Sequence, residues 1–179
     1  SWRHVHLTEA AAQQLFGHGL TVLRPLSQPG QFLANERVSV IGPKGRFENV
    51  AVLGPERDEA QVEVSLTDAR TLGLQVPVRL SGSVHNSPGA VLIGPQGRVM
   101  LMQGVIVARR HIHMTPEAAA HFGVKDKQVV RLQAFTDRPV VFDDVVVRIS
   151  KDFANYVHLD YDEANACGFA AGDLGRILP

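Results

Sequence analysis

Two short stretches of the chain each place two histidines one residue apart. They are Arg-His-Val-His-Leu-Thr at residues 3–8 and Arg-His-Ile-His-Met-Thr at residues 110–115, which contain His4, His6, His111 and His113. Alternate residues of a β-strand point to the same face, so each pair presents two imidazoles that can bind one zinc ion. Eight histidines scattered over 179 positions would produce roughly 0.35 such pairs by chance. Two pairs in one frame favour metal binding over the alternative, a duplicated strand with ordinary half-exposed histidines.

The two motifs belong to an internal repeat. The second motif follows the first at an offset of 107 residues, from Arg3 to Arg110, and each copy continues into a Glu/Ala-rich segment. Farther along the chain, residues 47–73 align without gaps with residues 142–168, at an offset of 95 residues. The first copy is therefore 12 residues longer between these two stretches. The excess most simply contains the turn-rich insertion Leu26–Phe32.

The repeat supplies a third candidate ligand for each histidine pair. His158 lies on an expected strand and aligns with Glu63 of the first copy. The chain thus offers two sets of three ligands, which are His111, His113 and His158, and His4, His6 and Glu63. Each set leaves the fourth tetrahedral position of a zinc ion open, as catalytic zinc sites do. The set of three histidines is the stronger one, because Glu63 is equally well explained as an ordinary carboxylate on a strand face.

The segments around these residues indicate short strands and short helices. The expected strands are β-branched or aliphatic, and they are Ser39–Ile41, Val50–Leu53, Val62–Ser65, Val91–Ile93, Val99–Met102, Val105–Val107, Val129–Leu132 and Val145–Ile149. The expected helices begin at Thr8, Thr67, Thr115 and Asp160 or Asp162, and end at Gly17, Gly73, Gly123 and Gly168. The chain shows no βαβ alternation. We therefore predict a mainly β fold of two related β-barrels capped by short α-helices, with a metal site between them.

The repeat also predicts how the chain divides into domains. The first barrel is expected over residues 3–108 and carries a flap insertion near residues 26–32. The second is expected over residues 109–179, together with any N-terminal strand at residues 1–2. No Gly-rich phosphate loop follows a strand in either part, so a nucleotide-binding α/β fold is not expected.

The composition gives no support to several classes of partner. Lys+Arg and Asp+Glu number 18 each, so the formal net charge is +0 and nothing indicates binding to nucleic acid or to a membrane surface. No apolar run is long enough to span a bilayer. The single cysteine, Cys167, excludes an internal disulfide and fits a reducing compartment. Any metal ion must therefore be bound by histidine and carboxylate groups.

The remaining polar residues are weaker candidates. His18, His85 and His121 occupy expected loop or helix positions, where a solvated or capping role explains them better than metal binding. Arg57 precedes the strand that contains Glu63. Its guanidinium can bind phosphate or carboxylate through two hydrogen bonds. By position alone, the default interpretation is an ordinary surface arginine in a charged turn.

These features together resemble one family, the PduL-type phosphate propanoyltransferases, which are the phosphotransacylases of bacterial microcompartments. The resemblance covers essentially the whole chain. It rests on both histidine motifs, on Gly-Pro-Glu-Arg at residues 54–57 leading to the Glu63 strand, and on Gln-Pro-Gly at residues 28–30. It implies two β-barrels capped by short helices with a dinuclear zinc site between them. It also implies the reaction acyl-CoA + phosphate ⇌ acyl phosphate + CoA, with propanoyl or acetyl as the acyl group.

The resemblance further implies a role for each candidate residue. His4, His6 and Glu63 would bind one zinc ion, whose open position takes the CoA sulfur, and His111, His113 and His158 would bind the other. Arg57 would bind phosphate and assist catalysis by offsetting its charge. Gln28, Pro29 and Gly30 would form a lid over the site. We expect phosphate to attack the thioester directly, because no strong covalent nucleophile is visible in the sequence.

The same resemblance implies the partners and the location of the protein. The partners are coenzyme A or acyl-CoA and phosphate or acyl phosphate, with a homo-oligomer and microcompartment shell or lumen enzymes left open. The location is the lumen of a bacterial microcompartment or the cytoplasm, and we expect no packaging segment within these residues. Two other functions stay open: a zinc-dependent hydrolase of acyl thioesters on the same scaffold, and a non-catalytic metal-binding or shell-docking module.

Overall fold

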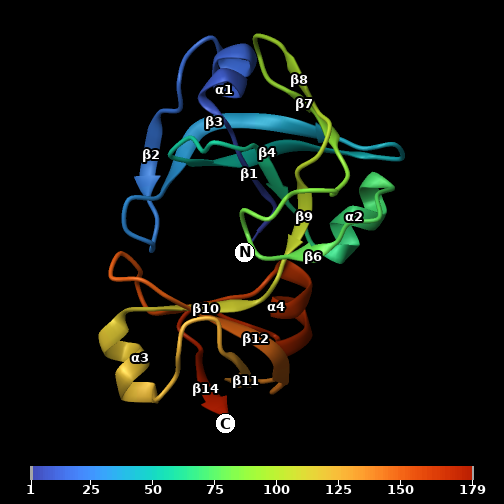
Figure 1. Ribbon diagram of the computed structural model, residues 1–179. Coiled ribbons are helices and arrows are strands. Elements are labelled where there is room, and N and C mark those ends of the chain that lie inside the picture. Colours follow the sequence, from blue (N-terminus) through green and yellow to red (C-terminus); the bar gives the residue numbers. More distant parts are fainter. Residues whose placement is uncertain (1, 179) are drawn as a thin grey trace. The chain divides into compact units, whose positions relative to one another are not determined.

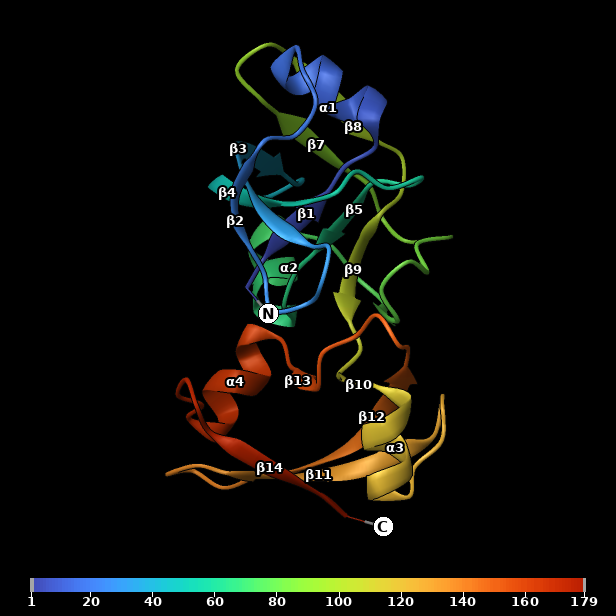
Figure 2. The same cartoon turned by 90° about the vertical axis from the view of Figure 1, so that its left-hand side faces the viewer.

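The computed structural model describes residues 2–178 and is mainly β, with four short helices, which confirms the predicted fold class (Figure 1). It divides into an N-terminal unit, Trp2–Ala108, and a C-terminal unit, residues 109–178. Each unit contains one strongly curled sheet that forms a half-barrel (Figure 2). Within the described residues, no helix is both long and apolar enough to cross a membrane.

A nine-stranded sheet forms the N-terminal unit. Its strands are β1 (His4–His6), β2 (Val22–Pro25), β3 (Phe32–Ile41), β4 (Arg46–Gly54), β5 (Gln61–Glu63), β6 (Val78–Arg79), β7 (Ala90–Ile93), β8 (Arg98–Leu101) and β9 (Val105–Ala108). They run in the order β6-β9-β5-β1-β4-β3-β7-β8, and β2 pairs with β3. The histidine strand β1 is therefore interior, parallel to β4 and antiparallel to β5. Neighbours on both sides satisfy its backbone groups and hold it rigidly.

The helix α1 (Glu9–Phe16) follows β1 directly and has the predicted boundaries. The side chain of Thr8 accepts a hydrogen bond from the backbone N–H of Ala11 and so caps its N-terminus. Gly17 ends the helix in the left-handed conformation, with φ 79°, which glycine adopts without steric cost. The strand β1 therefore ends at His6, the second histidine of the pair, and the helix cap follows at Thr8.

The helix α2 (Leu66–Leu72) begins earlier than predicted, because its cap is Ser65 and not Thr67. The Ser65 side chain accepts from the N–H of Asp68, and the Asp68 side chain accepts from the N–H of Ser65. This reciprocal capping box satisfies the backbone N–H groups of Ser65 and Asp68. A helix capped at Thr67 would not make this pair of hydrogen bonds. The predicted strand Val62–Ser65 accordingly ends at Glu63.

A five-stranded sheet forms the C-terminal unit. Its strands are β10 (His111–Met114), β11 (Val129–Phe135), β12 (Val141–Ile149), β13 (Tyr156–His158) and β14 (Leu174–Leu178), in the order β13-β10-β12-β11-β14. The helices α3 (Pro116–Phe122) and α4 (Tyr161–Cys167) begin after the predicted caps Thr115 and Asp160 and end at Gly123 and Gly168. The second histidine strand, β10, is again interior to its sheet.

The two sheets repeat the same pairing around their histidine strands. The paired residues are His4 with Glu63 and Ala51, and His111 with His158 and Val146. These partners are related by the offsets of 107 and 95 residues found in the sequence. The backbone repeats too, since Asn49 and Asp144 occupy equivalent positions with φ 55° and 56°. The sequence repeat therefore corresponds to a duplicated backbone.

Alternation along each histidine strand separates the core from the site. Val5 and Leu7 are fully buried in the core of the N-terminal unit, and Ile112 and Met114 are buried in the core of the C-terminal unit. Burying one such side chain stabilises the fold by roughly 1.5–3 kcal/mol. Because strand residues alternate between faces, the core side chains direct the histidines to the opposite face of the sheet.

All eight expected strands occur, but three observed strands, β2, β6 and β14, are not predicted. Every residue of β2 is exposed, so β2 lacks the alternation that reveals a half-buried strand. The β6 strand has only two residues, and β14 contains Gly175. Of the expected N-terminal strand at residues 1–2, Ser1 lies outside the described residues and Trp2 lies in no strand.

Candidate metal-binding site

Each unit brings three potential ligands together, with ligand atoms within 4.8 Å of one another. The groups are His4, His6 and Glu63 in the N-terminal unit and His111, His113 and His158 in the C-terminal unit, the sets that the repeat predicts. The members on β1, β5 and β10 are only 3–8% exposed. Buried polar groups are costly without partners, and a metal ion would be a common partner for each group.

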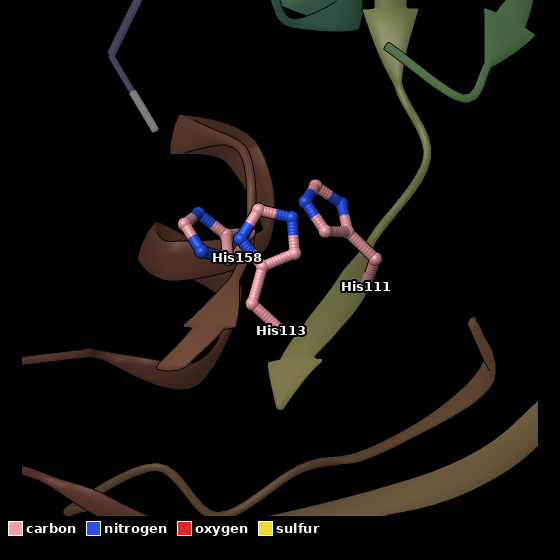
Figure 3. A group of neighbouring side chains, drawn as sticks. All are labelled: His111, His113 and His158. Carbon is pink, nitrogen blue, oxygen red and sulfur yellow. The ribbon is translucent and has the colours of Figure 1, made fainter. Parts of the chain in front are cut away.

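The C-terminal group consists of three imidazoles from β10 and β13, which turn toward one another (Figure 3). The ring centroids of His111 and His113 are 4.7 Å apart, and the His158 centroid lies 4.7 Å from the first and 4.4 Å from the second. His158 lies opposite His111 across the antiparallel pair, so all three rings emerge from the same face. The three candidate ligands of this group are thus all imidazole nitrogens.

The first histidine of each pair is oriented by the backbone. The Nδ1 of His4 lies 2.8 Å from the carbonyl oxygen of Trp2, and the Nδ1 of His111 lies 2.8 Å from that of Arg109. A carbonyl oxygen only accepts, so in both residues Nδ1 carries the proton and donates it. In the neutral form of each imidazole, the lone pair is consequently on Nε2, which is the tautomer that metal-binding histidines adopt when Nδ1–H is held in this way.

His113 fits a metal ligand best, because both of its ring nitrogens are buried without a hydrogen-bond partner. Its ring stacks on Phe153, with centroids 4.0 Å apart. Burial, followed by the charges of His111 and Arg148, lowers the pKa of His113 to about 4. The imidazole is therefore neutral near pH 7 and has a free lone pair, as zinc binding requires. A zinc ion held by these three histidines would satisfy one of the two unpaired nitrogens.

The N-terminal group combines two imidazoles with one carboxylate. The Nε2 of His4 lies 3.4 Å from Glu63 Oε2, and the Nε2 of His6 lies 3.8 Å from Glu63 Oε1. Burial alone would raise the pKa of Glu63, but the charges of His4 and His6 and hydrogen bonds from His4 and Ser81 hold it well below its usual range. Burial likewise opposes protonation of His4, yet Glu63 raises its pKa. Glu63 is thus an anion that a bound cation would match.

Arg57 is held close to the N-terminal group of His4, His6 and Glu63. Its backbone N–H donates to the carbonyl oxygen of Leu7, the residue after the histidine pair, over 2.8 Å. Burial, followed by the charges of His4 and Arg57, lowers the pKa of His6 to about 3. A guanidinium near the histidines can bind an oxyanion through charged hydrogen bonds. The structure therefore brings this predicted residue to the N-terminal group.

Two further polar residues belong to this group and are not predicted from the sequence. The side-chain NH2 of Gln61 donates to Glu63 Oε1 over 2.6 Å, and the Ser81 hydroxyl donates to the same oxygen over 2.9 Å. Gln61 lies two residues before Glu63 on one strand, so strand alternation could have placed it on the same face. Ser81 lies in the loop after β6, and no local pattern in the sequence points to it.

The other predicted residues lie at a range of places. Gln28, Pro29 and Gly30 form the loop between β2 and β3, where the Gln28 side chain is buried and the other two residues are exposed; their role as a lid stays a prediction. The guanidinium of Arg3, the residue before His4, donates to Asp68 Oδ1 over 2.8 Å. Cys167 is 1% exposed and packs in the core of the C-terminal unit.

Comparison with known proteins identifies the family of this chain. The family model of phosphate propanoyltransferase matches residues 1–170. The phosphate propanoyltransferase of Enterococcus faecalis is 55% identical over 180 residues, which cover 99% of this chain and 85% of that protein. Those of Listeria monocytogenes and Clostridioides difficile are 52% and 50% identical, with 84% and 86% of their lengths covered. The predicted resemblance is confirmed, and the chain belongs to the phosphate propanoyltransferase family of acyltransferases.

Proposed function

We propose that this enzyme transfers a propanoyl group between coenzyme A and inorganic phosphate, with a zinc ion held by each group of three ligands. The observation that carries this proposal is the pair of three-ligand groups, of which one has Arg57 beside it. Three protein ligands leave a zinc ion able to accept a substrate atom. A cation near the same group suits a phosphate substrate, and the names of the relatives supply the propanoyl group.

The residues of the chain divide the work of this reaction. When bound, zinc supplies Lewis-acid stabilisation for the sulfur that leaves as a thiolate. Arg57 binds phosphate and reduces its negative charge, so that a phosphate oxygen can approach the thioester carbonyl. A C–O bond to phosphate then forms and the C–S bond to CoA breaks. The buried Cys167, whose thiol donates to the Ala164 carbonyl, is not placed to act as a covalent nucleophile, so direct transfer is the simpler route.

A phosphate-dependent assay, combined with a metal count, tests this function. Propanoyl-CoA and phosphate should give free CoA and propanoyl phosphate, and the protein should contain two zinc ions per chain. Release of CoA with free propanoate in the absence of phosphate would instead indicate the hydrolase alternative, which the family does not support. A full rate of transfer from metal-free protein would contradict the role of zinc.

We further propose that the loop of Gln28, Pro29 and Gly30 covers the bound substrate. The loop is closed on itself by hydrogen bonds, from the N–H of Leu26 to the carbonyl of Gln31 and from the N–H of Gln31 to the carbonyl of Gln28. Replacing Pro29 by glycine should raise the KM for acyl-CoA and leave the metal content unchanged.

On family grounds, we propose the microcompartment lumen or the cytoplasm as the location of the enzyme. Fractionation of cells would test this location.

A further inference from the structure

The Ser81 hydroxyl lies between two residues of opposite charge in the N-terminal group. Its Oγ is 2.9 Å from Glu63 Oε1 and 3.3 Å from Arg57 Nη1, and it is also 2.9 Å from the side-chain nitrogen of Gln61. Ser81 is 18 residues from Glu63 in sequence and comes from the loop after β6. The neutral Ser81 hydroxyl thus lies between Glu63, a candidate metal ligand, and Arg57, a candidate phosphate-binding residue.

The direction of each hydrogen bond in this network follows from chemistry. The backbone N–H of Gly82 donates to Gln61 Oε1 over 2.7 Å, so the orientation of the Gln61 amide is determined and its NH2 group faces Ser81 and Glu63. The NH2 of Gln61 and the guanidinium of Arg57 can only donate. Ser81 Oγ must therefore accept from both, and its single proton is left for Glu63 Oε1.

The network distinguishes the two oxygens of the Glu63 carboxylate. Oε1 accepts from both Ser81 and Gln61, whereas Oε2 faces His4 Nε2 at 3.4 Å. A carboxylate anchored through one oxygen presents the other in a fixed direction. Without the hydroxyl, nothing in this network would separate the Arg57 guanidinium from Glu63, and a direct ion pair would occupy both charges. Such a pair would compete with a metal ion for Glu63 and with phosphate for Arg57.

We propose that Ser81 is a positioning residue that keeps Glu63 available to a metal ion and Arg57 available to an oxyanion by hydrogen bonding to both. This role rests on the proposed function, because it requires a metal ion at the N-terminal group. It assigns to the loop after β6 a part in the chemistry of that group. Partners that orient a metal ligand in this way typically change metal affinity by about 10–100-fold when they are removed.

Cobalt binding to the protein tests the role of Ser81 apart from catalysis. In a His113→Ala background, which disables the C-terminal group, Co2+ absorption reports the N-terminal group alone. We expect Ser81→Ala to weaken Co2+ binding by about 10–100-fold. The matched control is Ser83→Ala, since Ser83 lies in the same loop and takes no part in the network. Ser81→Thr retains the hydroxyl and should restore the affinity.

Three results would count against this role. The first two would leave the proposed function intact, and the third would overturn it as well. Equal Co2+ affinity in Ser81→Ala and Ser83→Ala overturns the positioning role and leaves the proposed function intact. A Ser81→Thr variant as weak as Ser81→Ala assigns the loss to packing and also overturns it. If the background protein with Ser81 intact binds no Co2+, the metal centre itself is overturned together with this role. With His113 intact, Ser81→Ala should in addition raise the KM for phosphate more than Ser83→Ala does.

Discussion

The two halves of the chain have the same backbone around their histidine pairs, but the residues around the two candidate ligand groups differ. In the N-terminal half, the third ligand is the carboxylate Glu63, anchored by polar side chains and accompanied by Arg57. In the C-terminal half, the third ligand is His158, and the ring of Phe153 stacks on the ring of His113. The N-terminal group therefore contains an anionic ligand with hydrogen-bond donors of its own. The C-terminal group instead contains three imidazoles, with the charge of Arg148 acting on His113.

The equivalent positions show where the halves diverged. At the offset of 95 residues, Arg57 corresponds to Asp152 and Gln61 to Tyr156, while Ser81 lies beyond the aligned stretch and has no counterpart. The features that remain the same are those that set geometry: the interior strand, the two-residue spacing of the histidines, and the carbonyl that receives each first Nδ1–H. Duplication thus preserved the positions of the ligands, while the residues that differ adjust charge and the binding of anions.

The strongest way to separate the halves is to remove one histidine from each. His6→Ala and His113→Ala should each lose one of two zinc ions, measured by elemental analysis, because each group binds its own ion. Activity should fall in both variants by on the order of 10³-fold, which corresponds to several kcal/mol of lost metal stabilisation. His121→Ala, on the exposed side of α3, is the control and should keep both ions. Loss of both ions from either variant would show that the groups are not independent.

Replacing the charged residue that distinguishes the halves should have a smaller effect. Arg57→Ala should raise the KM for phosphate by about 10–100-fold, since a hydrogen bond to a charged group contributes about 1.5–3 kcal/mol. The matched variant is Asp152→Ala, at the equivalent position of the C-terminal half, which should leave the KM for phosphate unchanged. Steady-state kinetics at saturating acyl-CoA measures both. Equal effects of the two substitutions would remove Arg57 from the phosphate site.

The sequence predicts the ligands better than their surroundings. The strand period places His4 with His6, and the repeat selects Glu63 and His158, because a gap-free alignment carries the strand register with it. Ser81 is beyond such reasoning, because its position depends on how the loop after β6 folds back on β5. The metal ligands depend on local geometry, and their positioning residues depend on contacts that are distant in sequence.

The fold shows the same division between local and tertiary information. Helix ends are predicted well where one side chain satisfies the first backbone donors, as at Thr8 and Thr115. The error at Thr67 arises because two residues, Ser65 and Asp68, cap α2 jointly. The exposed strand β2 is missed because edge strands form by pairing and carry little hydrophobic pattern. The structure divides into compact units at the predicted position, between residues 108 and 109, whereas two independent domains stay a prediction.

Where the halves are alike, matched substitutions should have similar, modest effects. Arg3 pairs with Asp68 at 2.8 Å and Arg110 pairs with Glu163 at 2.7 Å, so each arginine ties its histidine strand to a helix cap. Arg3→Ala and Arg110→Ala should each lower the free energy of unfolding by about 0.5–1 kcal/mol. The Arg3 effect should be the larger, because its guanidinium lies 4.1 Å from the Phe47 ring centroid, compared with 5.6 Å between Arg110 and Phe142.

Urea unfolding at neutral pH measures these differences, with Arg98→Ala, an exposed arginine on β8, as the control. That control should leave the midpoint unchanged. A larger loss of stability in Arg110→Ala than in Arg3→Ala would contradict the assignment of the difference to the ring contact.

The smallest expected effect concerns His6 and His113, which should not titrate near neutral pH. In metal-free protein, the pKa values of His6 and His113 are lowered from 6.5 to about 3 and about 4, mainly by burial. Both rings should therefore stay neutral from pH 8 down to about pH 5, and their NMR ring signals should not shift over this range. In the unfolded chain both residues bind a proton below about pH 6.5. Their contribution to stability is consequently full above that pH and is lost as the pH falls toward their folded values.

This titration also separates the halves, because His4 should behave in the opposite way. Glu63 raises the pKa of His4 despite burial, so its signals should report protonation above the ordinary value of 6.5. Replacing Glu63 by glutamine should remove that charge and lower the His4 pKa, while His113 in the other half keeps its own value. A shift of His113 in the Glu63→Gln variant would mean that the electrostatics of the two groups are coupled, and that each half cannot be treated as an independent metal site.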